Sequence, residues 1–219
     1  MQKSSLIILT SLTLAGCVTI VDARDIDQNR TLPTFDKVQA SRGIEVSLRC
    51  GPAPAARLEG DEHDLANTEL SVESGVLTVR RASMIGSYHR TVHVEVTAPG
   101  PLVRLSAGSG ANIDAPACVT SHEHLDLAAS SGATIHLAAD VRRLSVDTGS
   151  GASIRPLKGG RIDAADAEID ASSGSSVRLC KVGRMQADAS SGADIMAESI
   201  GSGDSHSSFG GGVSLRQCE

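Results

Sequence analysis

The chain of 219 residues contains few aromatic side chains: it has no tryptophan, one tyrosine and two phenylalanines. Aromatic faces on which a sugar ring could stack are therefore almost absent. Hydrophobic residues still make up 40% of the chain, so its core must be built from alanine, valine, isoleucine and leucine, which suit a narrow interior. Because 21% of the residues are charged and the apolar ones recur periodically, the scarcity of aromatics does not indicate disorder.

Several functional classes lack their sequence signatures. The chain has 26 acidic residues against 20 Lys and Arg, a net charge of −6 and no basic stripe, which argues against binding to nucleic acid. Gly-x-Ser-x-Gly, phosphate-loop and His-Glu-x-x-His motifs are all missing from the sequence. We therefore expect no catalytic residues, no cofactor and no enzyme activity.

One short phrase is repeated between residues 108 and 213, as in Gly-Ser-Gly-Ala-Asn-Ile (108–113) and Ser-Ser-Gly-Ala-Thr-Ile (130–135). Its central glycine recurs at Gly110, Gly132, Gly151, Gly174, Gly192 and Gly210. These positions lie 22, 19, 23, 18 and 18 residues apart. Such a period, near 20 residues, is typical of the stacked coils of a solenoid.

Apolar and polar residues alternate on both sides of each glycine, which is the period of a β-strand. Three residues after the glycine the chain has Ile113, Ile135, Ile154, Val177, Ile195 and Val213. A flexible Gly/Ser linker has no reason to keep Ile or Val there, so we predict coils of strand, corner, strand and loop. Stacked at the ~4.8 Å spacing of paired strands, they form an all-β fold, a single-stranded parallel β-helix. A glycine suits a corner that needs positive φ.

The first residues predict export. The apolar stretch 6–15 is too short to span a membrane and ends in Leu14-Ala15-Gly16-Cys17. These four residues resemble the bacterial lipobox, which implies a lipidated Cys17 as the mature N-terminus and attachment to the membrane through its lipid. Val18 favours the outer membrane. The alternative is ordinary cleavage after Val21-Asp22-Ala23.

The chain divides into four segments. We assign residues 1–16 to a lipoprotein signal peptide, 17–34 to a polar tether, 35–100 to an N-terminal cap with the first coils, and 101–219 to the repeated coils. Both open ends of a β-helix expose unpaired strand edges that need cover. We therefore expect 35–100 to be continuous with the repeated coils in one domain.

The order of these parts resembles a known family. Phe35-Asp36-Lys37-Val38, Gly75-Val76-Leu77 and Val94-Glu95-Val96-Thr97-Ala98-Pro99, between a lipobox and reiterated Gly/Ser corners, are together similar to the bacterial GIN domain family of auto-transporter adhesin head domains. The resemblance covers about residues 35–215. It implies a right-handed β-helix exported to the cell envelope, with no established catalytic activity. The last coil departs from the pattern, since Gly203, Ser205 and Ser207 stand where apolar residues belong.

Four cysteines remain when Cys17 is set aside: Cys50, Cys118, Cys180 and Cys218. An even number in an exported chain indicates disulfides, with three possible connectivities. Proximity in sequence favours Cys50–Cys118 and Cys180–Cys218. The second pair lies on coils two rungs apart, about 10 Å along a regular stack, so that it would require the C-terminal tail to fold back. The alternative is free, buried thiols.

Three further groups of residues are weak candidates for a metal site or a catalytic site. His122-Glu123-His124 could point two imidazoles at one metal ion, Asp194 stands within a corner as calcium-binding solenoids require, and Asp204-Ser205-His206 contains the residue types of a catalytic triad. Triad residues usually come from distant segments, and loop histidines are usually solvated. We therefore predict no metal site and no catalytic site at these positions.

Two function classes remain. We favour a non-catalytic scaffold of the cell envelope that binds an envelope or extracellular protein or a glycan; the alternative is a polysaccharide-active β-helix enzyme of the envelope. A candidate binding row is formed by the corner residues Ser109, Ser131, Ser150, Ser173 and Ser191 and by the flanking residues Asn112, Thr134, Ser153, Ser176 and Asp194. The favoured alternative is that these serines only build the corners.

Overall fold

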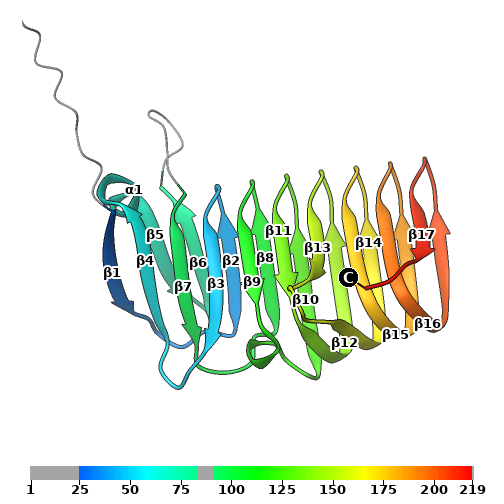
Figure 1. Ribbon diagram of the computed structural model, residues 1–219, viewed down its shortest axis with the longest axis horizontal. Coiled ribbons are helices and arrows are strands. Elements are labelled where there is room, and N and C mark those ends of the chain that lie inside the picture. Colours follow the sequence, from blue (N-terminus) through cyan, green and yellow to red (C-terminus); the bar gives the residue numbers. More distant parts are fainter. Residues whose placement is uncertain (1–24, 83–90, 219) are drawn as a thin grey trace, which may run out of the picture.

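A computed structural model describes residues 25–82 and 91–218 (Figure 1). These residues form a parallel β-solenoid, which confirms the predicted fold class. The predicted signal peptide and Cys17, together with residues 83–90, lie outside the described residues. Among those that are described, no helix is long and apolar enough to cross a membrane.

The repeated coils run from residue 104 to residue 215 and stack strand upon strand in parallel register. Their elements are β8 (Arg104–Gly108), β9 (Asn112–Ala115), η1 (Ala117–Val119), β10 (His124–Ala129), β11 (Thr134–Leu137), β12 (Ala139–Thr148), β13 (Ser153–Pro156), β14 (Ile162–Ala171), β15 (Ser176–Ala189), β16 (Asp194–Ser207) and β17 (Gly212–Leu215). The register places equivalent residues of successive coils beside each other, so that Ile135 lies between Ile113 and Ile154.

The core is a column of stacked aliphatic side chains, as the alternation predicts. Ile113, Ile135, Ile154 and Ile195 are completely buried, and each contributes about 1.5–3 kcal/mol by leaving water. One polar pair interrupts the column. The Thr148 and Ser175 hydroxyls, both buried, lie 3.0 Å apart and satisfy each other by a hydrogen bond.

Each corner contains two residues of positive φ. The glycine has positive φ, as predicted, and so has the residue before it: Ser173 has φ 53° and Gly174 has φ 68°. The N–H after the glycine donates to the carbonyl before the serine and closes the turn, as Ser175 N–H does to Ser172 O at 3.2 Å. Gly174 then donates to the carbonyl of Ser191 in the next corner at 3.0 Å. The corners are thus joined by a backbone ladder, and side-chain hydroxyls are not needed to link them.

In the later coils, the segment predicted to be a loop is a β-strand instead, and it forms a third side of the solenoid. β15 runs without a break through 14 residues, and β16 does the same. The prediction of a loop is wrong here because this segment also carries inward apolar residues. Val141, Ala164 and Val182 lie in register on successive coils and are buried.

The N-terminal part adds two coils out of chain order. Its elements are β1 (Asp25–Thr31), β2 (Lys37–Ser41), β3 (Glu45–Cys50), β4 (Ala55–Asp61), α1 (Glu62–Ala66), β5 (Thr68–Glu73), β6 (Val76–Arg81) and β7 (His93–Ala98). The β2–β3 coil lies between the β6–β7 coil and the β8–β9 coil, parallel to both. The chain therefore passes outward to the end of the stack and returns past its own first coil.

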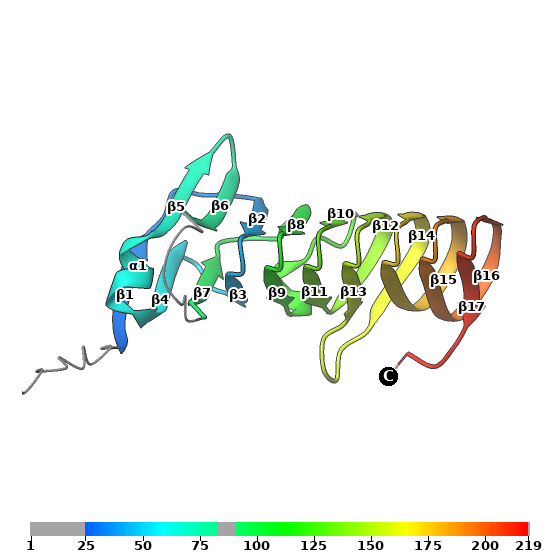
Figure 2. The same cartoon turned by 90° about the horizontal axis from the view of Figure 1, so that it is seen from above.

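Antiparallel strands close this end of the stack (Figure 2). β4 pairs with β7, β1 pairs with β4, and β5 pairs with β6, all antiparallel. Strand β1 corrects the predicted tether 17–34, because Asp25–Thr31 belongs to the sheet. Its polar sequence gives no strand pattern, and its strand conformation comes from pairing with the free edge of β4.

Two disulfides tie segments that are distant in sequence. Cys50 at the end of β3 is bonded to Cys118 in η1, with Cα atoms 6.1 Å apart. Cys180 in β15 is bonded to Cys218, with Cα atoms 4.9 Å apart. The chain after β17 turns back along the stack to reach Cys180 (Figure 2).

Candidate binding surface

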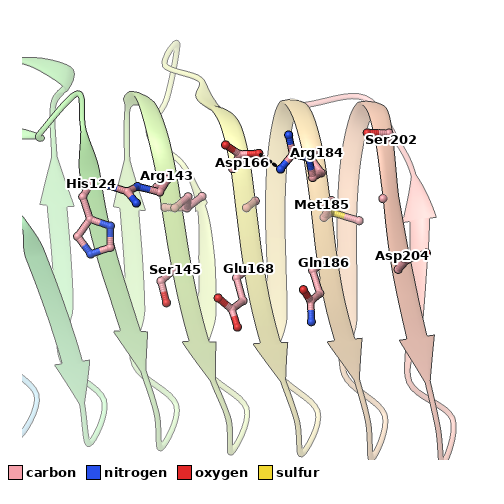
Figure 3. Close-up of a pocket in the computed structure, with 13 residues that line it drawn as sticks. His124, Arg143, Ser145, Asp166, Glu168, Arg184, Met185, Gln186, Ser202 and Asp204 are labelled. Atoms are coloured by element: carbon pink, nitrogen blue, oxygen red, sulfur yellow. Dashed lines mark ion pairs between the residues drawn. The ribbon is translucent and has the colours of Figure 1, made fainter.

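A groove crosses the outer face of β10, β12, β14, β15 and β16 (Figure 3). Its volume is about 830 Å³. Because outward side chains lie in register on parallel strands, the groove is lined by rows that run along the solenoid, perpendicular to the strands. Buried Leu144, Ala167 and Met185 also contribute to its lining.

The first row alternates in charge. It consists of His124, Arg143, Asp166, Arg184 and Ser202, each in register with the next. Arg184 forms an ion pair with Asp166 at 3.3 Å, and Figure 3 shows the two side chains turned toward each other. The Arg184 side chain is 75% exposed, so this pair contributes little to stability and its donors remain accessible to a ligand.

The second row is polar and acidic. It consists of Ser145, Glu168, Gln186 and Asp204, again in register. Figure 3 shows the Glu168 and Gln186 side chains side by side on the outer surface. Together the rows offer hydrogen-bond donors and acceptors of both charges, with no aromatic side chain among the groove residues.

Beside the groove, toward the corners, a row of like charges follows. Asp147, Asp170 and Asp188 lie in register and are exposed, and His206 ends the row. Within the described part of the chain, none of the three aspartates has an ion-pair partner within 4.0 Å. This side of the groove therefore carries negative potential.

The opposite face holds its charges in internal pairs. His136 Nδ1 lies 2.8 Å from Asp114 Oδ1, and Arg155 Nε donates to His136 Nε2 at 2.9 Å. On a third side, Arg161 lies 3.2 Å from Asp163 and 3.0 Å from Glu198. The hydrogen bond that Arg161 donates to Asp163, followed by the one that it donates to Glu198, raises the pKa of the Arg161 guanidinium above its ordinary value.

The chemistry-bearing residues of the sequence are kept apart. His122 Nδ1 lies 2.9 Å from the Asp140 carbonyl, whereas His124 Nε2 lies 2.8 Å from Asp126. The two imidazoles thus engage different neighbours. No group of three or more His, Cys, Asp or Glu that could hold a metal ion occurs among residues 25–82 and 91–218. Ser205 alternates with Asp204 and His206 on one strand, so it faces the other side of the sheet.

The row predicted from the corner serines exists as a stack but not as a groove. Asn112, Thr134, Ser153, Ser176 and Asp194 lie in register beside the corners. The groove lies instead on the strands that precede the corners. The alternation in the sequence makes these outward positions polar but does not single them out, because their residue types differ from coil to coil. The in-register stacking of charged positions at fixed distance before each glycine was the signal that could have found it.

Solved structures share this fold. A "putative adhesin" from Bacteroides fragilis superposes with a TM-score of 0.60 at 11% identity, covering 88% of this chain and 97% of the other. A "putative adhesin" from Parabacteroides distasonis gives a TM-score of 0.54 at 12% identity, covering 89% and 98%. At these identities the likeness concerns the fold alone. A search among curated proteins finds no match.

The sequence itself carries the family relationship. The family model described as "Putative auto-transporter adhesin, head GIN domain" matches residues 34–216. This range spans all the repeated coils and the N-terminal cap except strand β1, and it confirms the resemblance drawn from the sequence motifs. The chain therefore belongs to this GIN domain family.

Proposed function

We propose that the protein is a non-catalytic, adhesion-type scaffold of the bacterial cell envelope and that the groove is its binding surface. The observation that carries the proposal is the groove itself, which has a volume of about 830 Å³ and carries two rows of polar and charged side chains on a stack of paired strands. Its polar rows of both charges, without aromatic side chains, suit an extended, polar partner such as a segment of an envelope or extracellular protein. Adhesins are the class to which the family description refers.

The same proposal includes export and anchoring through a lipidated Cys17, with the protein held at the outer membrane. The supporting observation is the lipobox directly after an apolar stretch of signal-peptide length. The described chain enters the stack at β1, and the groove extends to β16 at the other end (Figure 1). An N-terminal anchor would thus leave the groove accessible.

Beads coated with the purified protein test the binding surface. Wild-type beads and beads carrying Glu168→Lys are applied to intact bacterial cells, to immobilised extracellular matrix proteins and to a glycan array. The matched control is Asp194→Lys, an exposed acidic residue on β16 outside the groove that undergoes the same charge change. We expect Glu168→Lys to reduce retention at least threefold on a surface that holds wild-type beads, and Asp194→Lys to leave it unchanged. Equal retention of all three would exclude the groove.

A reducing-end assay on the same glycans separates the scaffold from a polysaccharide-active enzyme. We expect no release of reducing ends by wild type. Release that disappears in Glu168→Gln would establish the enzyme instead.

Mass spectrometry of the protein from a detergent phase tests the anchor. We expect a mature N-terminus at acylated Cys17 and loss of membrane attachment in Cys17→Ala. An unmodified N-terminus at Arg24 would show that ordinary signal cleavage takes place.

A further inference from the structure

The last coil ends the stack on an unpaired strand edge. The second half of β16, from Ser199 to Ser207, pairs with β15 on one side, and no described residue pairs with its other side. β17 likewise pairs only with β16. Residues 201–207 are all exposed, and the two large hydrophobic side chains exposed in the described chain, Phe209 (89%) and Leu215 (67%), both belong to this coil.

The backbone of this edge points away from the stack. In each earlier coil, the carbonyl three residues before the corner glycine accepts from the next coil, as Ala189 O does from Ser208 N–H at 2.9 Å. The equivalent residue in the last coil is Ser207, which has no next coil. Because backbone groups alternate along a strand, Gly203, Ser205 and Ser207 direct their N–H and C=O groups to the free edge.

The two ends of the stack differ in this respect. At the N-terminal end, β1, β4 and β5 add antiparallel strands to the outermost coil. At the C-terminal end, the disulfide between Cys180 and Cys218 draws residues 216–218 back along the stack (Figure 1). These residues therefore do not cover the edge. Long free edges of this kind are templates for pairing with another strand.

We propose that the edge pairs with a second copy of this chain, with the two β16 strands antiparallel about a two-fold axis through Ser205. This register opposes Asp204 to the second copy's His206, and His206 to the second copy's Asp204. Opposed side chains on one face of an antiparallel pair are close enough to interact, so each copy supplies both halves of a reciprocal acid–imidazole pair. Self-complementarity of this kind is what a two-fold interface requires.

The same two-fold axis also pairs the free backbone groups of β16 and the free edge of β17. The Ser205 backbone exchanges both hydrogen bonds with its own symmetry mate, and Gly203 does so with the second copy's Ser207. A two-fold axis normal to the β16 sheet also brings the two β17 edges together, since β17 lies on the opposite face of the same coil. The interiors of the two last coils then face each other, and Leu215 of each copy is covered.

Engineered cross-linking tests this register on the processed protein purified from cells that export it. In Ser205→Cys, the two new thiols would lie on Cα atoms about 5.5 Å apart, within the range of a disulfide. In the control Ser207→Cys, on the same side of the same strand, they would lie roughly 13 Å apart. After mild oxidation we expect a species of twice the mass on a non-reducing gel for Ser205→Cys only. No such species, or equal yields from the two variants, would overturn the proposal, as would longer oligomers.

A charge exchange in the Ser205→Cys background supplies a second test. His206→Asp would oppose acid to acid across the axis and place it beside Asp188 in the same copy. We expect it to lower the cross-linked yield at least fivefold. Adding Asp204→His restores the reciprocal pair across the axis without relieving the contact with Asp188. The yield should therefore recover in the double exchange, and a yield that stays low would contradict the proposed register. The readout is self-association alone, which is measured without any ligand of the groove.

Discussion

The two ends of this solenoid differ in how they treat the strand edge and the core that an open end exposes. The N-terminal end is closed by antiparallel strands, and Leu58 of β4 and Leu65 of α1 are completely buried there. The C-terminal end places Gly203, Ser205 and Ser207 where the preceding coil has Met185, Ala187 and Ala189. It has little apolar interior left to cover. A solenoid can thus end either by adding a cap or by replacing the apolar residues of its last coil while keeping the backbone pairing of that coil.

The largest expected effect is the loss of stability when a buried apolar residue, rather than an exposed one, is replaced by aspartate. Leu58→Asp at the closed end, or Ile154→Asp in the middle, buries an unpaired charge and should lower the free energy of unfolding by at least about 4 kcal/mol. In protein too dilute to self-associate, Leu215→Asp, at a position 67% exposed, should change it by less than about 1 kcal/mol. Urea unfolding followed by circular dichroism measures all three. A Leu215→Asp variant as unstable as Ile154→Asp would contradict an open end.

Removal of each disulfide should lower the stability by a smaller amount, and by a different amount at the two ends. Cys50 and Cys118 enclose a chain separation of 68 residues, and Cys180 and Cys218 one of 38. Replacing Cys50 and Cys118 together by serine should cost up to about 4 kcal/mol through the greater entropy of the unfolded chain. Replacing Cys180 and Cys218 should cost less, because the loop is shorter and the tail that it holds is exposed. The midpoints of urea unfolding of the two double variants are compared, and the variant without Cys50 and Cys118 should unfold at the lower urea concentration. The reverse order would contradict this expectation.

The next prediction concerns the buried hydrogen bond between the Thr148 and Ser175 hydroxyls in the central coils. Ser175→Ala leaves the buried Thr148 hydroxyl without its side-chain partner and should cost about 1–3 kcal/mol. Other coils have alanine at both equivalent positions, for example Ala129 and Ala152. Thr148→Ala with Ser175→Ala should therefore cost less than the sum of the single changes, by about 1 kcal/mol. Strictly additive values in a double-mutant cycle would show that the two hydroxyls are not coupled.

The smallest effect concerns the last corner. Phe209 occupies the position held by serine in the earlier corners and has φ 48° with an exposed side chain. Phe209→Asn should stabilise the protein by about 0.5 kcal/mol, because asparagine tolerates the left-handed conformation better than a bulky residue does. Ser173→Asn at a central corner should give a smaller gain. Thermal melts of the two variants compare them, and a loss of stability in Phe209→Asn would contradict this account of the corner.

The repeated coils could be predicted from the sequence because each of their residues repeats a physical requirement. Gly174 needs positive φ, and Val177 needs burial, in every coil alike. The cap has no such redundancy. Strand β1 is polar and forms only because β4 offers an edge, and no local pattern places the β2–β3 coil between β6–β7 and β8–β9. The corner Arg42-Gly43, with φ 62° and 68°, follows the repeated turn, but arginine replaces the serine that marks the others.

The groove could not be predicted in the same way. Outward positions are free to vary, so Arg143, Asp166 and Arg184 share a row without sharing a residue type. Only the coil-to-coil register brings them together. The sequence does contain the spacing from which this register follows, but the residue types at these positions do not repeat from coil to coil.

Amide hydrogen exchange, resolved to single residues in β16 by NMR, most directly tests the central claim that the stack is closed at one end and open at the other. In dilute protein, the amides of Gly203, Ser205 and Ser207 should exchange rapidly, whereas those of Asp204, His206 and Ser208, which point to β15, should be protected. The amides of β4 at the closed end should show no such alternation, since β4 is paired on both sides. Uniform protection along residues 203–208 in dilute protein would contradict the open end.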